Sequence, residues 1–456
     1  MSLQFLGATG TVTGSKYRLS HGDHSILIDC GLFQGYKPLR LRNWAPLPFD
    51  PATLDAVLLT HAHLDHSGYL PLLVRNGFDG PIHCSEATAA LCKVLLPDSG
   101  RLQEEDAEHA NRHRYSKHHP ALPLYTEADA LRALERFEPR PWQQTFTAAP
   151  GIEAEMLPAG HLLGSAMLRI VAGGHSFLFS GDLGRPADLL MRPPVLPPPS
   201  ETLILESTYG DRRHAETDPM DELEAILTPV IARGGVAVVP SFAVGRTQTL
   251  LLCLHRLKAQ GRLPADLPIY LNSPMAIDAT AIYHHYRSEH RLSFEECEAM
   301  CRTAKLVNTI EQSKALNLRR GPMVIIAGSG MATGGRVIHH LQAFAPDPNN
   351  TIILTGFQAG GTRGAALLNG ADVVRIHGVY VPVRAEVKSL ANLSAHADYQ
   401  ETIDWLQRWP VAPRRVFLTH GELAAADALR RHLADAFGWD PIIPDYRDEV
   451  GLGAGT

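Results

Sequence analysis

The chain has 456 residues, which is too long for one ordinary hydrophobic core, so two or three domains are expected. Hydrophobic residues make up 45% of the chain and charged residues 20%, the balance of a soluble globular protein. The formal net charge of −6 provides no overall basic field, which argues against a protein that simply coats nucleic acid and leaves only a local basic cleft for such a partner.

The N-terminal part of the chain alternates short apolar runs with glycine-rich turns, which predicts strands of a layered sheet. Strands are expected at Leu3–Leu6, Tyr17–Leu19, Ser25–Asp29 and Ala56–Thr60, and helical patterns over Ser67–Asn76 and Glu86–Leu95. Residues 101–119 are polar and rich in histidine. We interpret this stretch as a solvated helix and loop, with a metal-binding histidine tract as the alternative.

A proline-rich connector over residues 192–200 predicts a domain boundary. Beyond it, continuous apolar strands are mostly followed by glycine- or proline-containing loops and helical segments, the pattern of a parallel α/β domain over residues 202–370. The chain then returns to strands and helices. The strands expected after the first 150 residues are Gly151–Leu157, Ala166–Val171, Ser176–Ser180, Val236–Pro240, Pro268–Asn272, Met323–Ala327, Thr351–Thr355, Asp372–Ile376, Ala385–Leu390 and Arg415–Thr419.

The six cysteines form no CxxC pair, which is typical of reduced, mostly buried thiols in a cytosolic protein. Cys297 and Cys301 lie one helical turn apart; we interpret them as packing residues, with a metal site as the alternative. The N-terminus has no basic flank or long apolar run, and no stretch approaches the roughly 20 apolar residues of a membrane span. We therefore expect a cytoplasmic protein without a membrane partner.

The strongest chemical motif is HAHLDH, which directly follows the apolar strand AVLLT. His61 and His63 lie two residues apart at the strand end, where an extended chain turns both rings to one side, and Asp65 and His66 follow at the start of a helix. Imidazole nitrogen and carboxylate oxygen are ligands that zinc prefers. The alternative is a polar loop that happens to hold three histidines.

Further candidate ligands stand at the carboxyl ends of other apolar runs: His161 in PAGHLLGSA, Asp182 in FSGDLG and His420 in FLTHGE. A lone histidine in such a place is more often structural, but together these residues predict two metal ions bridged by Asp182 and a hydroxide. Such a pair clamps the attacking and leaving oxygens of an in-line displacement and makes hydroxide available at neutral pH. Asp29 is expected to orient a ligand or the bridging water, with a turn-capping role as the alternative.

With these motifs in hand, the chain resembles the metallo-β-lactamase fold and, more narrowly, the β-CASP nucleases, over residues 1–446. The matching motifs, in chain order, are IDCG with Asp29, HAHLDH with His61 to His66, AGH with His161, SGD with Asp182, LESTYGDR with Glu206, SAHAD with His396 and LTHGE with His420. The resemblance implies an α/β fold in which an αββα sandwich is built from residues 1–204 and 371–456. A parallel α/β β-CASP domain is inserted as residues 205–370.

The resemblance also implies how the site residues divide. His61, His63, His161 and Asp182 would hold one Zn²⁺, and Asp65, His66, Asp182 and His420 the other. His396 would act as general acid for the leaving 5′ portion or as a phosphate clamp, paired with Glu206, because a carboxylate beside an imidazole fixes its tautomer and favours a protonated donor. Asp65, His396, Glu206 and Asp29 are therefore the catalytic candidates.

In this family a histidine at the position of His420 accompanies RNA-cleaving members, whereas DNA-processing members carry valine. The resemblance therefore implies a zinc-dependent endoribonuclease that cuts single-stranded RNA to 5′-phosphate and 3′-hydroxyl ends, with 5′→3′ exonucleolytic trimming as a further mode. Family members often pair, so a homodimer is expected by analogy.

Three loops of the inserted region, beginning at Ser241, Asn272 and Gly328, follow strands and precede helices, where backbone N–H groups can bind phosphate. Ser241, Arg246, Ser329 and Gly330 are the candidate substrate contacts; the alternative is that these loops are structural turns.

Three alternatives stay open. A small-molecule hydrolase, such as a thioesterase of glyoxalase II type, shares the HxHxDH core but does not need the insert. A redox di-iron protein typically has glutamate in place of one ligand. A non-catalytic RNA-binding scaffold would have lost metal ligands, and all seven are present here.

Overall fold

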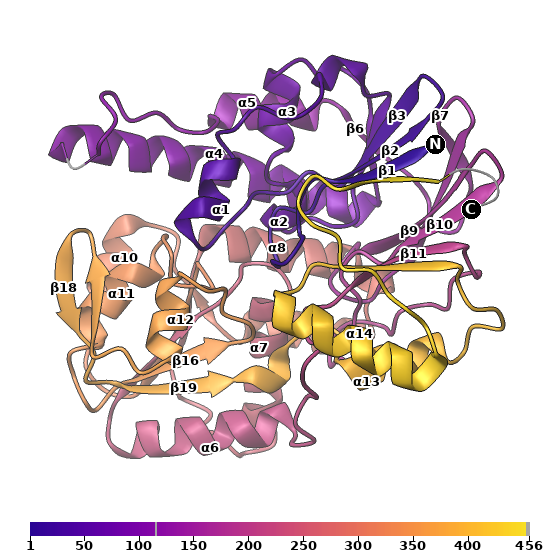
Figure 1. Ribbon diagram of the computed structural model, residues 1–456. Coiled ribbons are helices and arrows are strands. Elements are labelled where there is room, and N and C mark those ends of the chain that lie inside the picture. The colour runs from indigo at the N-terminus through magenta and orange to yellow at the C-terminus, as the bar shows by residue number, and fades with distance from the viewer. Residues whose placement is uncertain (115, 453–456) are drawn as a thin grey trace. The chain divides into compact units, whose positions relative to one another are not determined.

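The computed structural model describes residues 1–114 and 116–452, and the chain forms two compact units (Figure 1). Unit 1 is made of Met1–Arg213 and His396–Thr456, and unit 2 is the continuous segment His214–Ala395. Each unit has its own sheets and its own hydrophobic core.

Unit 1 contains two sheets whose facing sides form one core. The seven-stranded sheet has the order β21-β1-β2-β3-β4-β5-β6, and the six-stranded sheet has the order β20-β11-β10-β9-β8-β7. The first sheet consists of β1 (Ser2–Phe5), β2 (Tyr17–His21), β3 (His24–Ile28), β4 (Ala56–Leu58), β5 (Ile82–Cys84), β6 (Phe137–Pro139) and β21 (Glu449–Gly451). The second consists of β7 (Phe146–Ala149), β8 (Ile152–Pro158), β9 (Ala166–Ala172), β10 (His175–Phe179), β11 (Thr202–Glu206) and β20 (Arg415–Thr419).

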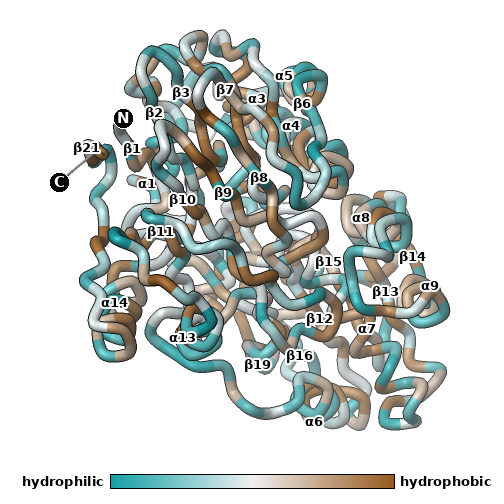
Figure 2. The backbone as a smooth tube through the Cα atoms, turned by 90° about the vertical axis from the view of Figure 1, so that its right-hand side faces the viewer, coloured by the Kyte–Doolittle hydropathy of each residue, from teal (hydrophilic) through white to brown (hydrophobic). Residues whose placement is uncertain are grey.

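The alternation of side chains along each strand explains this layering. In β8, Ile152, Ala154 and Met156 enter the core between the sheets, whereas Leu157 belongs to a second core on the outer face. Figure 2 shows brown, hydrophobic stretches along β8 and β9.

Helices cover the outer faces of the two sheets. Trp405 of α13 and Leu429 of α14 belong to the outer core of the six-stranded sheet, and α4 contacts β6 of the other sheet. This αββα arrangement confirms the predicted sandwich. The helices of unit 1 are α1 (Lys37–Arg42), α2 (Leu64–Ser67), α3 (Leu70–Arg75), α4 (Glu86–His113), α5 (Glu127–Leu134), α13 (Tyr399–Leu406) and α14 (Leu423–Phe437), with a 3-10 turn at Pro51–Thr53.

α4 is much longer than the helical pattern predicted from Glu86 to Leu95. It runs for 28 residues and includes Pro97. Buried positions continue beyond the proline at Ser99, Ala107 and Ala110, so the helix keeps a packed face through the polar stretch. Most of the predicted solvated segment is therefore the second half of this helix, and residue 115 lies outside the described residues.

Unit 2 is built on a six-stranded sheet in the order β14-β13-β15-β12-β16-β19, in which every pairing is parallel. Central strands such as β12 and β15 are buried along their whole length, which explains their continuous apolar sequences and confirms the predicted parallel α/β domain. The strands are β12 (Val236–Pro240), β13 (Ile269–Asn272), β14 (Lys305–Leu306), β15 (Met323–Ala327), β16 (Thr351–Thr355) and β19 (Glu386–Leu390), with the hairpin β17 (Val373–Ile376) and β18 (Val379–Pro382). The helices are α6 (Pro219–Ala232), α7 (Arg246–Ala259), α8 (Pro274–His285), α9 (Phe294–Arg302), α10 (Ile310–Leu316), α11 (Val337–Phe344) and α12 (Arg363–Leu368), with 3-10 turns at Arg287–Glu289 and Ala391–Leu393.

The division into units differs from the expected ranges 1–204, 205–370 and 371–456. Residues 205–213 lie in unit 1, since β11 pairs with β10 and β20 of its sheet. Residues 371–395 lie in unit 2 because β19 pairs with β16 there. In the described part of the chain, no helix is both long and apolar enough to cross a membrane.

Candidate metal centre

The HAHLDH motif forms a tight loop that leads from β4 into the four-residue helix α2. His61 and His63 precede the helix, and Asp65 and His66 lie within it. The backbone N–H of Cys30 donates to the carbonyl oxygen of His66 over 2.7 Å, which ties the loop to the end of β3. The motif is therefore held at the carboxyl ends of two adjacent strands.

The first group of candidate ligands consists of His61, His63, His161 and Asp182. Nδ1 of His63 lies 3.1 Å from Nε2 of His61 and 3.3 Å from Nε2 of His161. Oδ2 of Asp182 lies 3.5 Å from Nε2 of both His61 and His161. A tetrahedral zinc with ligand bonds of about 2.0–2.1 Å keeps its ligand atoms about 3.4 Å apart, so this donor set fits a zinc ion in both chemistry and spacing.

The second group brings Asp65, His66 and His420 together. Nε2 of His420 lies 3.1 Å from Nε2 of His66 and 3.5 Å from Oδ2 of Asp65. Oδ1 of Asp182 lies 3.2 Å from Nε2 of His66. Nitrogen atoms facing one another around carboxylate oxygens are the donor set expected for a second cation.

The charge states of these side chains favour cation binding. Burial lowers the pKa of His61 and His161 well below that of an ordinary imidazole, so both rings are neutral and offer lone pairs. Burial raises the pKa of Asp182, but neighbouring imidazoles outweigh it and hold the pKa well below its usual value. Burial also lowers the pKa of His66, but the carboxylates of Asp182 and Asp29 hold it well above normal. A cation would displace the proton that His66 otherwise carries.

Asp29 fixes the orientation of His66 from behind. Its Oδ2 lies 2.7 Å from Nδ1 of His66, so Nε2 of the same ring faces the candidate metal ligands. The backbone N–H and the hydroxyl of Thr60 both donate to Asp29, over 2.7 and 2.9 Å. Asp29 has a φ of +56°, a left-handed backbone conformation that is uncommon outside glycine and concentrates at functional sites.

His396 stands beside the two groups described above, and with Glu206, Asp182 and His420 it forms a further group of potential ligands. Nδ1 of His396 lies 3.1 Å from both carboxylate oxygens of Glu206, and Nε2 lies 3.9 Å from Oδ2 of Asp182. The backbone N–H of Leu183 donates to Glu206 over 2.5 Å, which holds the carboxylate in place. The side chain of His396 is 15% exposed, whereas that of Asp182 is 2% exposed, so His396 lies on the solvent side of the centre.

The structure adds two hydroxyl residues that the sequence did not single out. The hydroxyl of Thr208 lies 3.0 Å from Nδ1 of His420, the ring nitrogen on the side away from His66. Tyr17 donates from its hydroxyl to Thr419, the residue before His420, over 3.0 Å. Thr208 follows the strand end that carries Glu206, which was an available signal, but nothing in the sequence links Tyr17 to a residue 402 positions away.

The candidate loops that begin at Ser241 and at Gly328 lie side by side in unit 2. The backbone N–H of Ser241 donates to Ala327, the last residue of β15, over 3.0 Å. The hydroxyl of Ser329 accepts from the backbone N–H of Thr333 over 3.0 Å, so it is already used to shape its loop. A Cβ on Gly330 would lie 2.4 Å from the ring of Phe242, so glycine allows these loops to pack closely. The predicted Ser241, Ser329 and Gly330 therefore share the carboxyl edge of the parallel sheet.

Arg246 begins α7 at the same edge of the sheet. A Cβ on Gly356 would lie 3.0 Å from the guanidinium of Arg246, so the side chain passes directly over the loop after β16. The structure thus gathers all four predicted substrate contacts at one edge within unit 2.

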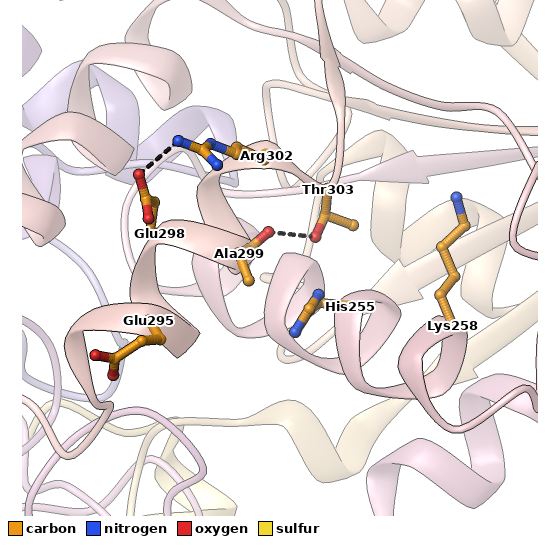
Figure 3. Close-up of a pocket in the computed structure, with 7 residues that line it drawn as sticks. All are labelled: His255, Lys258, Glu295, Glu298, Ala299, Arg302 and Thr303. Carbon is orange, nitrogen blue, oxygen red and sulfur yellow. Dashed lines mark hydrogen bonds and ion pairs between the residues drawn. The ribbon is translucent and has the colours of Figure 1, made fainter.

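A shallow pocket of about 480 Å³ also lies on unit 2, between α7 and α9 (Figure 3). Its lining carries both charges, with Lys258 and Arg302 on one hand and Glu295 and Glu298 on the other, and Arg302 donates to Glu298 over 2.5 Å. None of the predicted site residues lines it. This pocket therefore has no part in the candidate metal centre.

The two alternative metal sites are not formed in the described part of the chain. The rings of His109 and His113 pack 4.3 Å apart on α4, and Sγ of Cys297 lies 3.9 Å from Nε2 of His290, but none of these residues joins a group of three potential ligands. Cys297 and Cys301 lie on α9, and Cys297 is buried, as expected for packing residues.

Protein-family models match three parts of the chain. The Metallo-beta-lactamase superfamily matches residues 10–267, the Beta-Casp domain residues 247–367, and the Zn-dependent metallo-hydrolase RNA specificity domain residues 380–444. The first model covers more than half of the chain.

The chain is also similar to named relatives and, in fold, to one solved structure. The chain is 38% identical over 435 residues to Ribonuclease TTHA0252 of Thermus thermophilus, covering 94% of this chain and 95% of that protein. It is 32% identical over 437 residues to Transcription termination factor FttA of Methanosarcina mazei, covering 91% of this chain and 66% of that protein. A crystal structure of a protein of unknown function from Enterococcus faecalis V583 has a TM-score of 0.53 at 12% identity, covers 99% of both chains and supports the fold alone. The chain therefore belongs to the metallo-β-lactamase superfamily and, within it, to the β-CASP family of metal-dependent hydrolases.

Proposed function

We propose that the protein is a two-zinc ribonuclease in which Asp182 would supply a carboxylate oxygen to each ion. The supporting observation is the carboxylate of Asp182, whose Oδ2 faces His61 and His161 while Oδ1 faces His66. His61, His63, His161 and Asp182 would hold one Zn²⁺, and Asp65, His66, Asp182 and His420 the other. When bound, the ion pair would supply hydroxide at neutral pH and offset the negative charge that builds up on the phosphate.

His396 is the proposed proton donor to the leaving group. Because Nδ1 is engaged by Glu206, Nε2 is the nitrogen turned toward the metal centre. As hydroxide adds to phosphorus and the bond from phosphorus to O3′ breaks, protonated His396 would pass its Nε2 proton to O3′. The products are a 3′-hydroxyl on the leaving portion and a 5′-phosphate on the other fragment. The neutral ring keeps its proton on Nδ1, which donates it in a hydrogen bond to Glu206. This contact fixes the tautomer of the ring.

Single-stranded RNA is the proposed substrate. The match to an RNA specificity domain and the identity to a protein named as a ribonuclease support this choice. Cleavage inside the strand with 5′→3′ trimming as a further mode, a homodimeric state and a cytoplasmic location are proposed by analogy with the family. Ser241, Arg246, Ser329 and Gly330 are the proposed phosphate contacts of unit 2, with glycine allowing close approach of the backbone.

The test is to purify the protein, count zinc per chain by elemental analysis, and incubate it with labelled RNA, DNA and a thioester. RNA cleavage that is lost in Asp65→Ala and His396→Ala, but kept in His118→Ala at an exposed histidine of the same unit, is the expected result. Thioester turnover without RNA cleavage would identify a small-molecule hydrolase instead. RNA binding without cleavage of any substrate would identify a scaffold.

A further inference from the structure

Residues 34–42 form a largely exposed segment of unit 1 that includes helix α1. Together with Trp44, this segment is called the basic-aromatic arm. Tyr36, Leu41 and Trp44 are 58%, 55% and 58% exposed, and helix α1 within the arm has no buried residue. Single exposed apolar side chains are common, but several large ones within one short segment are a mark of an interaction site.

The charge of this region is opposite to that of the whole chain. Residues 30–49 contain Lys37, Arg40 and Arg42 and not one aspartate or glutamate, although the formal net charge of the protein is −6. Arg42 is engaged by the ring of Tyr446, 4.1 Å from its centroid, and so holds the arm in place. Lys37 and Arg40 are exposed. The arm therefore offers two aromatic rings and two cations to a single anionic partner.

The base of the arm is fixed to the candidate metal loop. The backbone N–H of Leu32 donates to Leu64, the residue between His63 and Asp65, over 2.8 Å. Asn43 closes the arm by accepting from the backbone N–H of Phe33 over 2.9 Å and donating to its carbonyl over 2.8 Å. Even if fully extended, the five-residue step from Leu32 to Lys37 spans no more than about 18 Å. A polymer bound on the arm therefore lies close to the metal centre of the same unit.

We infer that the basic-aromatic arm is a docking surface for single-stranded RNA, with bases stacked on Tyr36 and Trp44 and phosphates paired with Lys37 and Arg40. The inference rests on the proposed ribonuclease function and names a binding surface for that substrate. Alternating rings and cations suit a single strand, because every base offers a face for stacking whatever its sequence and the backbone offers one charge per nucleotide. An acidic protein segment would use the cations but not the exposed rings.

Tryptophan fluorescence tests the contact directly, since Trp44 is the one exposed tryptophan in the described part of the chain. A long phosphorothioate oligouridine is expected to quench the holoenzyme, and Trp44→Phe is expected to lose the signal while it binds with nearly unchanged Kd, because phenylalanine still stacks. Tyr36→Ala with Trp44→Ala should raise the Kd and the KM for RNA about fivefold or more. Tyr380→Ala, which removes a ring that is 72% exposed on unit 2, is the matched control and should change neither.

The cations are tested by the salt dependence of binding. Lys37→Ala with Arg40→Ala should lower the slope of log K against log salt by about 1.4, since each phosphate contact to a single strand contributes about 0.7. RNA cleavage by the wild type with KM, Kd and slope unchanged in both double variants would overturn the inference and leave the proposed function standing. Quenching of Trp44 by polyglutamate but not by RNA would also overturn it. A wild type that neither binds nor cuts RNA would instead remove the proposed function.

Discussion

Asp182 is a single side chain that faces both sets of candidate imidazole ligands. It belongs both to the group with His61, His63 and His161 and to a group with Glu206, His396 and His420, and its side chain is 2% exposed. A buried carboxylate with one oxygen toward each set of imidazoles would tie two cations to one loop. Substitutions at this residue and at the ligands around it should therefore have different effects on metal content.

Asp182→Ala is expected to lose most of both zinc equivalents, because each proposed site loses a ligand and the shared charge disappears. His161→Ala should lose about one equivalent, since His161 faces only the first group. Elemental analysis of the purified variants measures both. RNA cleavage should fall by more than about a hundredfold in Asp182→Ala. A hundredfold is the largest loss typical of a residue that only orients a metal ligand. Equal zinc loss in the two variants would contradict a bridging role.

His396→Ala should lower kcat for RNA by about 10²- to 10⁴-fold, the range for a lost general acid, with zinc content unchanged because His396 stands outside the proposed ligand sets. Glu206→Gln should lower kcat less, since the ring stays but loses its negative partner. A leaving group that needs no protonation, such as p-nitrophenol in a model phosphodiester, should reduce the deficit of His396→Ala. If the deficit persists with that substrate, His396 acts as a phosphate clamp and not as a proton donor.

Among the elements of secondary structure, strand ends and the loops between them build the centre. Asp29 follows β3, His61 follows β4, His161 follows β8, Asp182 follows β10 and His420 follows β20. These strands come from both sheets of unit 1, so the sandwich brings their carboxyl ends to one rim. Close packing of the loops then decides whether the ligands reach one another.

Gly31→Ala is expected to disturb the metal loop through the backbone alone. A Cβ at Gly31 would lie 1.6 Å from the carbonyl oxygen of Asp65, which no side-chain rotation can relieve. We expect a loss of about 3 kcal/mol in unfolding free energy and weaker zinc retention against a chelator. Gly451→Ala, where nothing lies within 4 Å of the added Cβ, is the control and should melt like the wild type. Equal melting curves for both variants would show that the loop can shift at little cost.

His83 in β5 should make the stability of unit 1 sensitive to acid. Burial and then the charge of Arg140 lower the pKa of His83 from 6.5 to about 4. The unfolded chain therefore takes up a proton more readily than the folded one, so stability falls as pH falls from about 6.5 towards 4. At pH 5 this amounts to about 1–2 kcal/mol.

Denaturant unfolding of the wild type and of His83→Asn at pH 7 and pH 5 measures this effect, because the asparagine variant removes this titration and leaves the others. The difference in unfolding free energy between the wild type and His83→Asn should be smaller at pH 5 than at pH 7. A constant difference at both pH values would exclude His83 as the source.

At the scale of the whole molecule, the candidate metal centre belongs entirely to unit 1, although its residues span positions 29–420. Unit 2 has a core of its own, centred on residues such as Val238, Ile325 and Leu354. Anything that binds the folded state stabilises the part of the molecule that it touches. Removing metal should thus affect one unit and spare the other.

Hydrogen exchange measured by mass spectrometry before and after chelation tests this expectation. Exchange should rise in the segments that carry His61 to His66, His161, Asp182 and His420. Peptides from β12 and β15 of unit 2 should stay protected. Loss of protection across both units on chelation would show that the metal stabilises the molecule as a whole.

From the printed sequence alone we could predict the candidate ligands, their positions at strand ends, a layered sheet and a parallel α/β domain, because period-two and continuous apolar patterns record burial directly; the αββα sandwich came from the family resemblance. The sequence did not determine that α4 continues through Pro97, since that depends on a packed face formed with distant residues. Nor did it reveal the hydrogen bond of Tyr17 to Thr419, the contact of Thr208 with the ring of His420, or the pairing of β19 with β16 that moves residues 371–395 into unit 2. Local pattern specifies what each segment can bury and which donor it carries. Which segments meet is decided by the packing of sheets whose strands lie hundreds of residues apart.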